Sequence, residues 1–248
     1  MKLTPEKRRQ LFRWVKGFGV FLLVWQTLFF LMPLLPSPWP PFYWALPVHG
    51  QVVDADTGQP LAGVIVAAHW ELRATGWTES PAGEVAVMEA VTDNDGRYVF
   101  RWWRPRWRWP SFGMLGSAGP GLLYFKSGYT PEQRTNDFFT HTTLGVIVHS
   151  EQDGAIIKLQ KFQGTEKEYV EKVFWFDEQL EFAFRYRDCS WKKIPRMLIA
   201  MDQEGKRLKA KGVRTILGGV PSSLESRADG ANERWCGSLN TYFRSYMQ

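Results

Sequence analysis

The feature that most constrains this chain is a long stretch near its N-terminus without any charged residue. No Asp, Glu, Lys or Arg lies between Lys16 and Asp54, and the strongly apolar part covers 18–35. A helix of that length rises about 27 Å, which is close to the thickness of the hydrocarbon core of a bilayer. The stretch predicts a transmembrane anchor over 17–36, followed by a proline- and aromatic-rich linker over 37–46.

Basic residues crowd the N-terminal side of this apolar stretch. Residues 1–17 contain six Lys or Arg and one Glu, so most of the formal net charge of +6 belongs to the tail 1–16. The positive-inside rule places such a tail in the cytoplasm. We therefore expect a single-pass protein of the bacterial inner membrane with the bulk of its chain in the periplasm. A cleaved signal peptide has the same polarity and stays open as the alternative, although the apolar run is long and no Ala-x-Ala-like site follows.

From Val48 onward the pattern changes to that of short β-strands. Over 63–72 apolar side chains alternate strictly, with Val66, Ala68 and Trp70 on one face and Ala67, His69 and Glu71 on the other. Further strand-like runs, separated by Gly, Asp and Pro turns, are 48–54, 85–92, 97–100, 122–125, 144–149 and 155–159. Short strands without intervening helical patterns predict a mainly β, antiparallel sandwich over 47–163.

Four segments of this region carry a resemblance to a known family. They are 50–54 (GQVVD), 57–66 (TGQPLAGVIV), 92–100 (TDNDGRYVF) and 126–129 (KSGY). In this order they resemble the carboxypeptidase regulatory-like domain. The resemblance implies a seven-stranded antiparallel sandwich of the transthyretin-like or immunoglobulin-like type, which accompanies other proteins as a folding or binding module. Here the connection between Phe100 and Gly128 is longer than the family's usual one.

The turn residues of these segments have a conformational meaning of their own. Gly58 and Gly96 lie where tight turns need a positive φ, which glycine adopts without strain. The run 93–96 (DNDG) resembles the start of a calcium loop, but the twelfth position holds Arg104 in place of the glutamate ligand. A hairpin turn is favoured, and we interpret these residues as specifying the fold.

Candidate catalytic residues are few. None of the four histidines lies in a zinc-binding H-E-x-x-H segment, and no nucleophile-elbow or phosphate-loop motif occurs. We therefore predict no metal, no cofactor and a non-enzymatic binding or structural module with a protein partner in the cell envelope. The alternative is an accessory subunit or a cryptic hydrolase whose site assembles from His69, Glu71 or His149. Convergence of these residues in one cleft with a neighbouring carboxylate would favour that alternative.

The most unusual segment is a run of four Trp and four Arg around Pro105. Its members are Arg101, Trp102, Trp103, Arg104, Arg106, Trp107, Arg108 and Trp109. Trp favours the headgroup layer and Arg attracts anionic headgroups, so the segment is a candidate contact with the membrane or an anionic polymer. The competing interpretation is that the Trp residues cap the sandwich core and the Arg stems cover them. Nucleic acid is not expected as a partner, because the predicted compartment lacks it.

Beyond residue 163 the pattern becomes helical, which predicts a helical region over 164–248. Tyr169, Val173, Phe176, Leu180 and Phe184 form one helical stripe, and a second helix begins at Pro195 and ends before Gly212. The last stretch, 239–246, is expected to form a short helix. Cys189 and Cys236 bracket this region, and in an oxidising compartment they are expected to form a disulfide, with two separate buried thiols as the alternative.

Overall fold

The computed structural model describes residues 19, 21–22, 24–27, 42–74, 80–107, 114–115, 119–135, 140–142, 145–147, 150–185, 188–216, 221–227 and 233–246. Its strands are β1 (Phe42–Ala45), β2 (Val48–Asp54), β3 (Ile65–Ala74), β4 (Ser80–Val91), β5 (Arg97–Phe100), β6 (Trp103–Trp107), β7 (Met114–Leu115), β8 (Gly121–Phe125), β9 (Glu132–Arg134), β10 (Thr140–Thr142), β11 (Gly145–Ile147) and β12 (Ala155–Leu159). Its helices are α2 (Glu166–Glu178), α3 (Phe182–Arg185), α4 (Pro195–Ala210), α5 (Glu233–Cys236) and α6 (Leu239–Arg244), with 3-10 turns η3 (Gln179–Glu181) and η4 (Ser190–Lys193).

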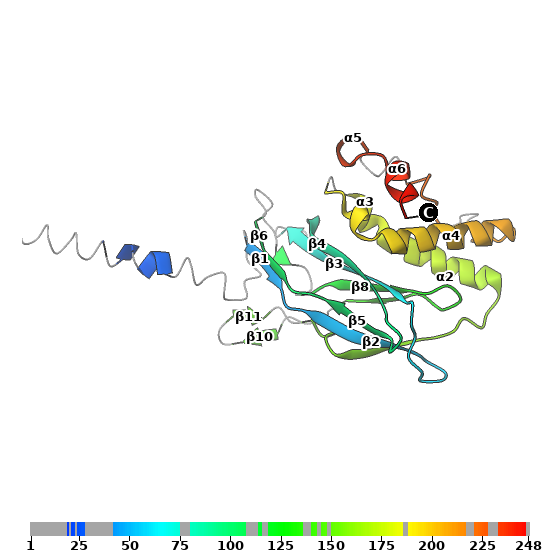
Figure 1. Ribbon diagram of the computed structural model, residues 1–248, viewed down its shortest axis with the longest axis horizontal. Helices are drawn as coiled ribbons and strands as arrows, with labels where there is room; N and C mark the ends of the chain where they lie inside the picture. The colour runs from blue at the N-terminus through cyan, green and yellow to red at the C-terminus, as the bar shows by residue number, and fades with distance from the viewer. Residues whose placement is uncertain are drawn as a thin grey trace, which may run out of the picture.

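Two sheets form the body of the molecule, which confirms the prediction of a mainly β fold. One sheet has the strand order β12-β2-β5, and the other has β4-β3-β8-β9 with the short β7 also paired to β3 (Figure 1). The prediction that every pair is antiparallel is wrong at one place, because β12 runs parallel to β2. β12 joins β2 from far along the chain, and the alternation of side chains that sequence reveals is the same for both strand directions.

The first hydrophobic core lies between the two sheets. Val66, Ala68 and Trp70 of β3 point into it, as the alternation predicts, and Val52 meets them from β2. The core also holds Tyr98 of β5 and Tyr124 of β8, whose buried hydroxyl groups lie 2.8 Å apart and hydrogen-bond across the gap. This hydrogen bond offsets part of the cost of burying the two hydroxyls, so the two sheets are joined by a polar contact inside an apolar layer.

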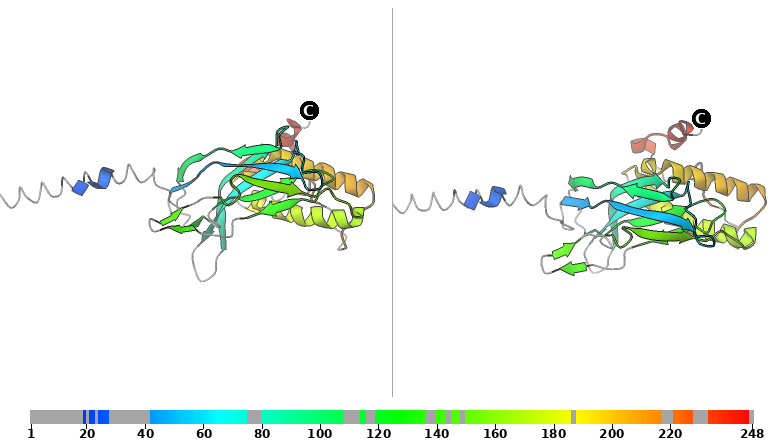
Figure 2. Two further views of the ribbon diagram at one scale, coloured as in Figure 1. Left: turned by 90° about the horizontal axis from the view of Figure 1, so that it is seen from below. Right: turned by 60° about the horizontal axis from the view of Figure 1, so that its bottom comes forward.

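A second core lies on the outer face of the five-stranded sheet, where the helices form a third layer (Figures 1 and 2). Ala67, Leu123 and Phe125 pack there against the stripe of α2 and against α4. α2 begins with a capping box, in which Thr165 and Glu168 satisfy each other's backbone N–H groups. α4 has proline at its first position and ends before Gly212, which has a φ of +70°. The predicted helices, including the short C-terminal one, are therefore present.

One turn connects different elements from those expected. Gly58 and Gly96 both have a φ of +70°, as predicted. The turn 93–96, however, joins β4 of one sheet to β5 of the other, so it is a corner between sheets and the hairpin expectation is wrong. Local sequence predicts that the chain reverses here. Whether the two flanking strands then pair is decided by the rest of the core.

The N-terminal residues that the structure describes are helical and lie apart from the body (Figure 1). The side chains of Phe21, Leu22, Val24 and Trp25 are all exposed. Within the described parts of the chain, no helix is long and apolar enough to span a bilayer. The rest of the predicted anchor lies outside the described residues, as does the first half of the linker, 37–41, whereas 42–45 form strand β1.

Candidate ligand-binding cleft

A cleft of about 300 Å³ lies where the five-stranded sheet meets the end of α2 and α3. β3 contributes His69 and Glu71 to its walls, and the helical layer contributes Phe182 and Arg185. Gln133, Glu178 and Gln179 also line it, so most groups around the opening are polar. We call this site the His69 cleft.

The floor of the His69 cleft holds a buried carboxylate–imidazole pair. Nδ1 of His69 lies 3.3 Å from Oε2 and 3.4 Å from Oε1 of Glu84. The Glu84 side chain is 0% exposed and that of His69 is 17% exposed. A buried carboxylate is costly unless it is paired, so Glu84 depends on its neighbours in this cleft.

A β-bulge brings Glu84 onto the cleft side of the sheet. β3 and β4 pair as Trp70 with Ala86 and then as Glu71 with Glu84, so Val85 is an extra residue on β4. Val85 and Ala86 both face the sandwich core in consequence. Without the extra residue, alternation would turn Glu84 toward that apolar core, and the bulge re-aims it toward His69.

The His69 ring is held by Phe182 and by the backbone of β8. It stacks on the ring of Phe182 from α3, with centroids 4.1 Å apart and planes 10° from parallel. Gly121 lies opposite His69 in the β3–β8 register, and a Cβ at this glycine would overlap Nε2 of His69. The ring is therefore fixed by packing and by its pairing with Glu84.

Acidic side chains are in excess around the His69 cleft. Arg185 lies 3.9 Å from a carboxylate oxygen of Glu71, which is itself opposite Glu84 in the β3–β4 register. Burial raises the pKa of Glu84, the bond to His69 opposes this, and the nearby carboxylates of Glu71 and Asp188 raise the pKa further. Acidic groups thus outnumber the one imidazole and the one guanidinium of the cleft, which favours ligands that carry positive charge or hydrogen-bond donors.

This arrangement sets the hydrogen-bonding state of His69. When Glu84 is ionised it accepts the Nδ1 proton, and the second ring nitrogen, Nε2, is then left as an acceptor. Nε2 lies over Gly121 at the wall of the cleft. In that tautomer, a bound molecule that reaches Nε2 would meet a hydrogen-bond acceptor.

Two of the three residues named for the enzyme alternative converge here. His69 and Glu71 line one cleft, with the carboxylate of Glu84 behind them, whereas His149 lies outside the described residues. Glu84, Phe182 and Arg185 were missed from the sequence. A glutamate within the otherwise apolar run 81–88 is a signal for Glu84, but nothing local links it to His69.

The Trp/Arg segment is divided between several environments. Trp103 is buried in the sandwich core, edge-on to Trp70 with ring centroids 5.8 Å apart, while Arg101 and Trp102 are exposed. Only the backbone is described for Arg104, Arg106 and Trp107, and Arg108 and Trp109 lie outside the described residues. β5 ends at Phe100, and the break that follows it turns Trp103 into the core while Trp102 stays at the surface.

The predicted disulfide between Cys189 and Cys236 is present. It joins the segment before η4, next to Asp188 near the floor of the His69 cleft, to α5 of the helical layer. Across the described ranges, no cluster of three or more His, Cys, Asp or Glu side chains is placed to hold a metal ion.

Comparison with known proteins gives little to add to this geometry. No family model matches the chain, and no curated protein matches it. Among solved structures, a 9R-lipoxygenase from Cyanothece PCC8801 is 12% identical to this chain, with a TM-score of 0.22. The match covers 66% of this chain and 26% of the lipoxygenase chain. A likeness at that score carries no argument about fold or function.

Proposed function

We propose that this chain is a membrane-anchored, extracytoplasmic binding module of the bacterial cell envelope, and that the His69 cleft is its ligand site. Its body is a transthyretin-like sandwich of the carboxypeptidase regulatory-like kind, with a helical layer added to one face. The cleft lies between that added layer and the sheet, so the helical region completes the binding site.

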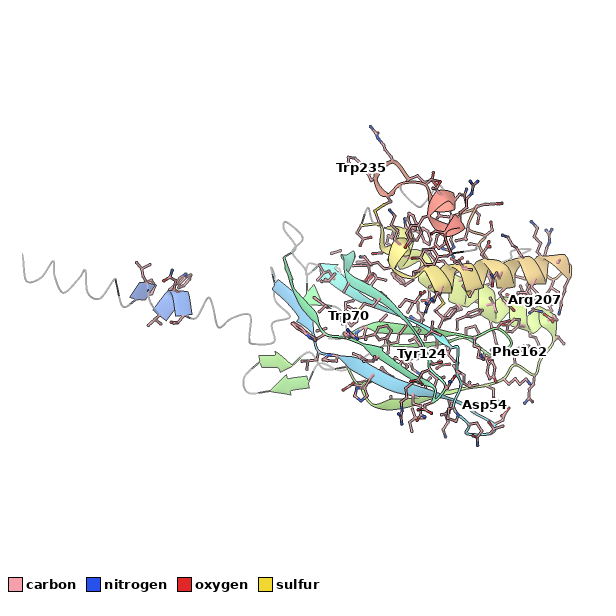
Figure 3. The ribbon with its side chains drawn as sticks, in the orientation of Figure 1. Asp54, Trp70, Tyr124, Phe162, Arg207 and Trp235 are labelled. Carbon is pink, nitrogen blue, oxygen red and sulfur yellow. A yellow bond between two sulfur atoms is a disulfide. The ribbon has the colours of Figure 1, made fainter. Side chains whose placement is uncertain are left out.

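The segments that resemble the carboxypeptidase regulatory-like domain support this assignment by how they meet. Asp54 accepts hydrogen bonds from the backbone N–H of Thr57 and from the hydroxyl of Tyr129, at 2.9 and 3.0 Å. Thr92 donates to the carbonyl of Leu61 and accepts from the backbone of Val64. All four segments are thereby linked near one end of the sandwich, which agrees with a role in specifying the fold (Figure 3).

The proposed location outside the cytoplasm is supported by two features at opposite ends of the chain. Disulfides persist in oxidising compartments such as the periplasm and are rare in the cytosol, and the chain's two cysteines form one. The apolar side chains of Phe21, Leu22, Val24 and Trp25 are exposed, as is expected of a helix whose surroundings are lipid. A reporter enzyme that needs an oxidising compartment, fused after the C-terminus, should be active in the alkaline-washed membrane fraction. Recovery of the chain in the cytosol would contradict the proposed location.

The observation that carries the binding role is the fully buried Glu84 beneath a polar cleft. Burying this carboxylate weakens the fold relative to an apolar residue, and a ligand that uses the His69 pair gives a reason for keeping it.

To test this, a photo-crosslinking residue is placed at Gln179 on the rim of the cleft in the full chain. We expect adducts in the native envelope that disappear when Glu71→Ala is added. A crosslinker at exposed Trp175, outside the cleft, is the control, and identical adducts from both positions would refute the proposal.

A second function, acid–base hydrolysis, is favoured by the convergence of His69 and Glu71 with Glu84. The imidazole would act as a general base through Nε2, oriented by the Glu84 carboxylate. Peptidoglycan fragments and simple esters, incubated with the full chain and with His69→Gln, decide between the two. Turnover by the parent that His69→Gln abolishes would make the chain an enzyme.

A further inference from the structure

The Trp/Arg segment is joined by backbone pairing to the chain that leads out of the body toward the N-terminus. β6 runs antiparallel to β1, with Phe42 opposite Trp107 and Tyr43 opposite Arg106. Figures 1 and 2 place both strands at the end of the body nearest the N-terminal helical residues. The segment therefore has a fixed position beside the base of the tether.

The register shifts by one residue between Tyr43 and Ala45, and from Ala45 it continues into the sandwich. Ala45 pairs with Trp103 and Val48 pairs with Phe100, so the intervening Leu46 and Trp102 lie opposite each other between the two ladders. Leu46 and Trp102 are both exposed, whereas Trp103 beside them is buried in the core. The buried Trp103 fastens the two-stranded ribbon to the body, and the exposed pair remains on its surface. We define the tether ribbon as residues 42–46 and 101–107.

We propose that the tether ribbon is a docking surface for anionic lipid headgroups, which holds the body in one orientation against the membrane that anchors it. This proposal rests on the proposed anchor. The ribbon contains Arg101, Arg104 and Arg106 but no acidic residue, and the rest of it is rich in aromatic residues. Arg attracts lipid phosphates, and Trp and Tyr favour the headgroup layer because one edge is apolar and the other can hydrogen-bond.

Because the connection between the ribbon and the anchor is short, weak lipid contacts are sufficient to hold the ribbon against the membrane. Once the chain is anchored, the ribbon meets the membrane at a high effective concentration, and docking then costs little additional entropy. Fewer than ten residues separate the predicted end of the anchor, residue 36, from Phe42. A soluble protein partner would gain no such advantage from this position, so the lipid surface is the favoured occupant.

The chain offers a matched pair of positions for the test. Its two cysteines are joined in the disulfide, so a single introduced cysteine is the only thiol for a fluorescent label. Trp102 is 57% exposed on the tether ribbon, and Trp175 is 59% exposed on α2 beside Phe162, which lies at the other end of the body (Figure 3). The full chain carrying Trp102→Cys or Trp175→Cys is labelled and reconstituted into vesicles of phosphatidylglycerol mixed with phosphatidylcholine.

Quenching by a nitroxide on the lipid headgroup measures the contact. We expect the label at 102 to be quenched several-fold more than the label at 175. The difference should shrink in phosphatidylcholine alone, at high salt, and when Arg101→Gln is added. Equal quenching at both positions in a chain that stays with the vesicles after an alkaline wash would overturn the docking proposal. Loss of the chain from the vesicles in that wash would overturn the anchor, and the docking surface with it.

Discussion

Gly58 and Gly96 share one backbone conformation but differ in their surroundings, and this makes them a matched pair. Both have a φ of +70°, while a Cβ at Gly58 meets no atom within 4 Å and a Cβ at Gly96 would overlap the Val52 carbonyl oxygen. Gly58→Ala should lower the free energy of unfolding by about 1 kcal/mol, the cost of the left-handed conformation alone. Gly96→Ala should cost at least about 2 kcal/mol more, because backbone must move. Urea unfolding of both variants measures the difference, and equal losses would contradict the overlap.

Asp54 gives a prediction of how the stability of the fold changes in acid. Hydrogen bonds from the backbone of Thr57, from the Tyr129 hydroxyl and from the backbone of Asp56 hold the pKa of this carboxyl below its ordinary value of 3.8. A lowered folded pKa stabilises the protein above the unfolded pKa, and this contribution is lost as the pH falls through the folded pKa. Asp54→Asn should therefore be less stable than the parent at pH 7, with a gap that closes in acid below pH 3.8.

Thermal unfolding from neutral pH into acid measures that gap. The control is Asp95→Asn, because Asp95 is exposed and its ion pair with Arg97 is 3.6 Å long. Exposed pairs of this kind contribute little, so the control should follow the parent across the range. A gap for Asp54→Asn that stays constant down to the lowest pH would show that the hydrogen bonds do not act through the ionised carboxylate.

At the scale of elements, α4 depends on a residue from the sheet. Ile194 at its N-cap offers no side-chain acceptor, and the carboxylate of Glu89 on β4 instead accepts from the backbone N–H groups of Arg196 and Met197, at 3.1 and 2.7 Å. Burial raises the pKa of Glu89 despite these bonds. Glu89→Ala should cost about 1–2 kcal/mol of unfolding free energy, as the loss of a helix cap does.

Hydrogen exchange separates this cap from a general loss of stability. In Glu89→Ala the first turn of α4 should lose protection more than α2 does, because α2 carries its own capping box. Glu132→Ala is the control, since Glu132 forms a surface ion pair with Arg134 on β9, and such pairs contribute little. A uniform loss of protection over both helices would mean that Glu89 acts on the whole layer and not as a cap.

The positions of strands and helices could be predicted where the sequence has a local periodicity. Features that depend on how strands distant in the sequence pair could not be predicted. The sequence runs 48–54 and 155–159 coincide with β2 and β12, but the parallel direction of β12 depends on where the intervening chain enters the sheet. His69 and Glu71 could be named as a pair because they follow each other on one strand face. Glu84 could not be joined to them, since a bulge at Val85 decides which face it takes.

At the scale of the whole molecule, the three layers are held together by different means. The two sheets share an apolar core, whereas the C-terminal helices α5 and α6 are short and are joined to the rest by packing and by the disulfide. Trp191 of η4 contacts Tyr242 and Phe243 of α6, and the Tyr242 hydroxyl donates to the carbonyl of Lys192. Cys189 lies directly before this contact, so the disulfide and the aromatic cluster act on the same junction.

Removing the disulfide should therefore loosen this junction before it unfolds the sandwich. The bridge closes a loop with a sequence separation of 47, for which the chain-entropy model gives a stabilisation of about 4 kcal/mol. The double variant Cys189→Ser with Cys236→Ser should lower the free energy of unfolding by about 2–4 kcal/mol, because part of that gain is commonly offset by other terms. In hydrogen exchange, α6 should open first while β3 and β8 stay protected. If the sheets lost protection together with α6, the third layer would be an integral part of one cooperative unit, and the His69 cleft could not open independently of the sandwich.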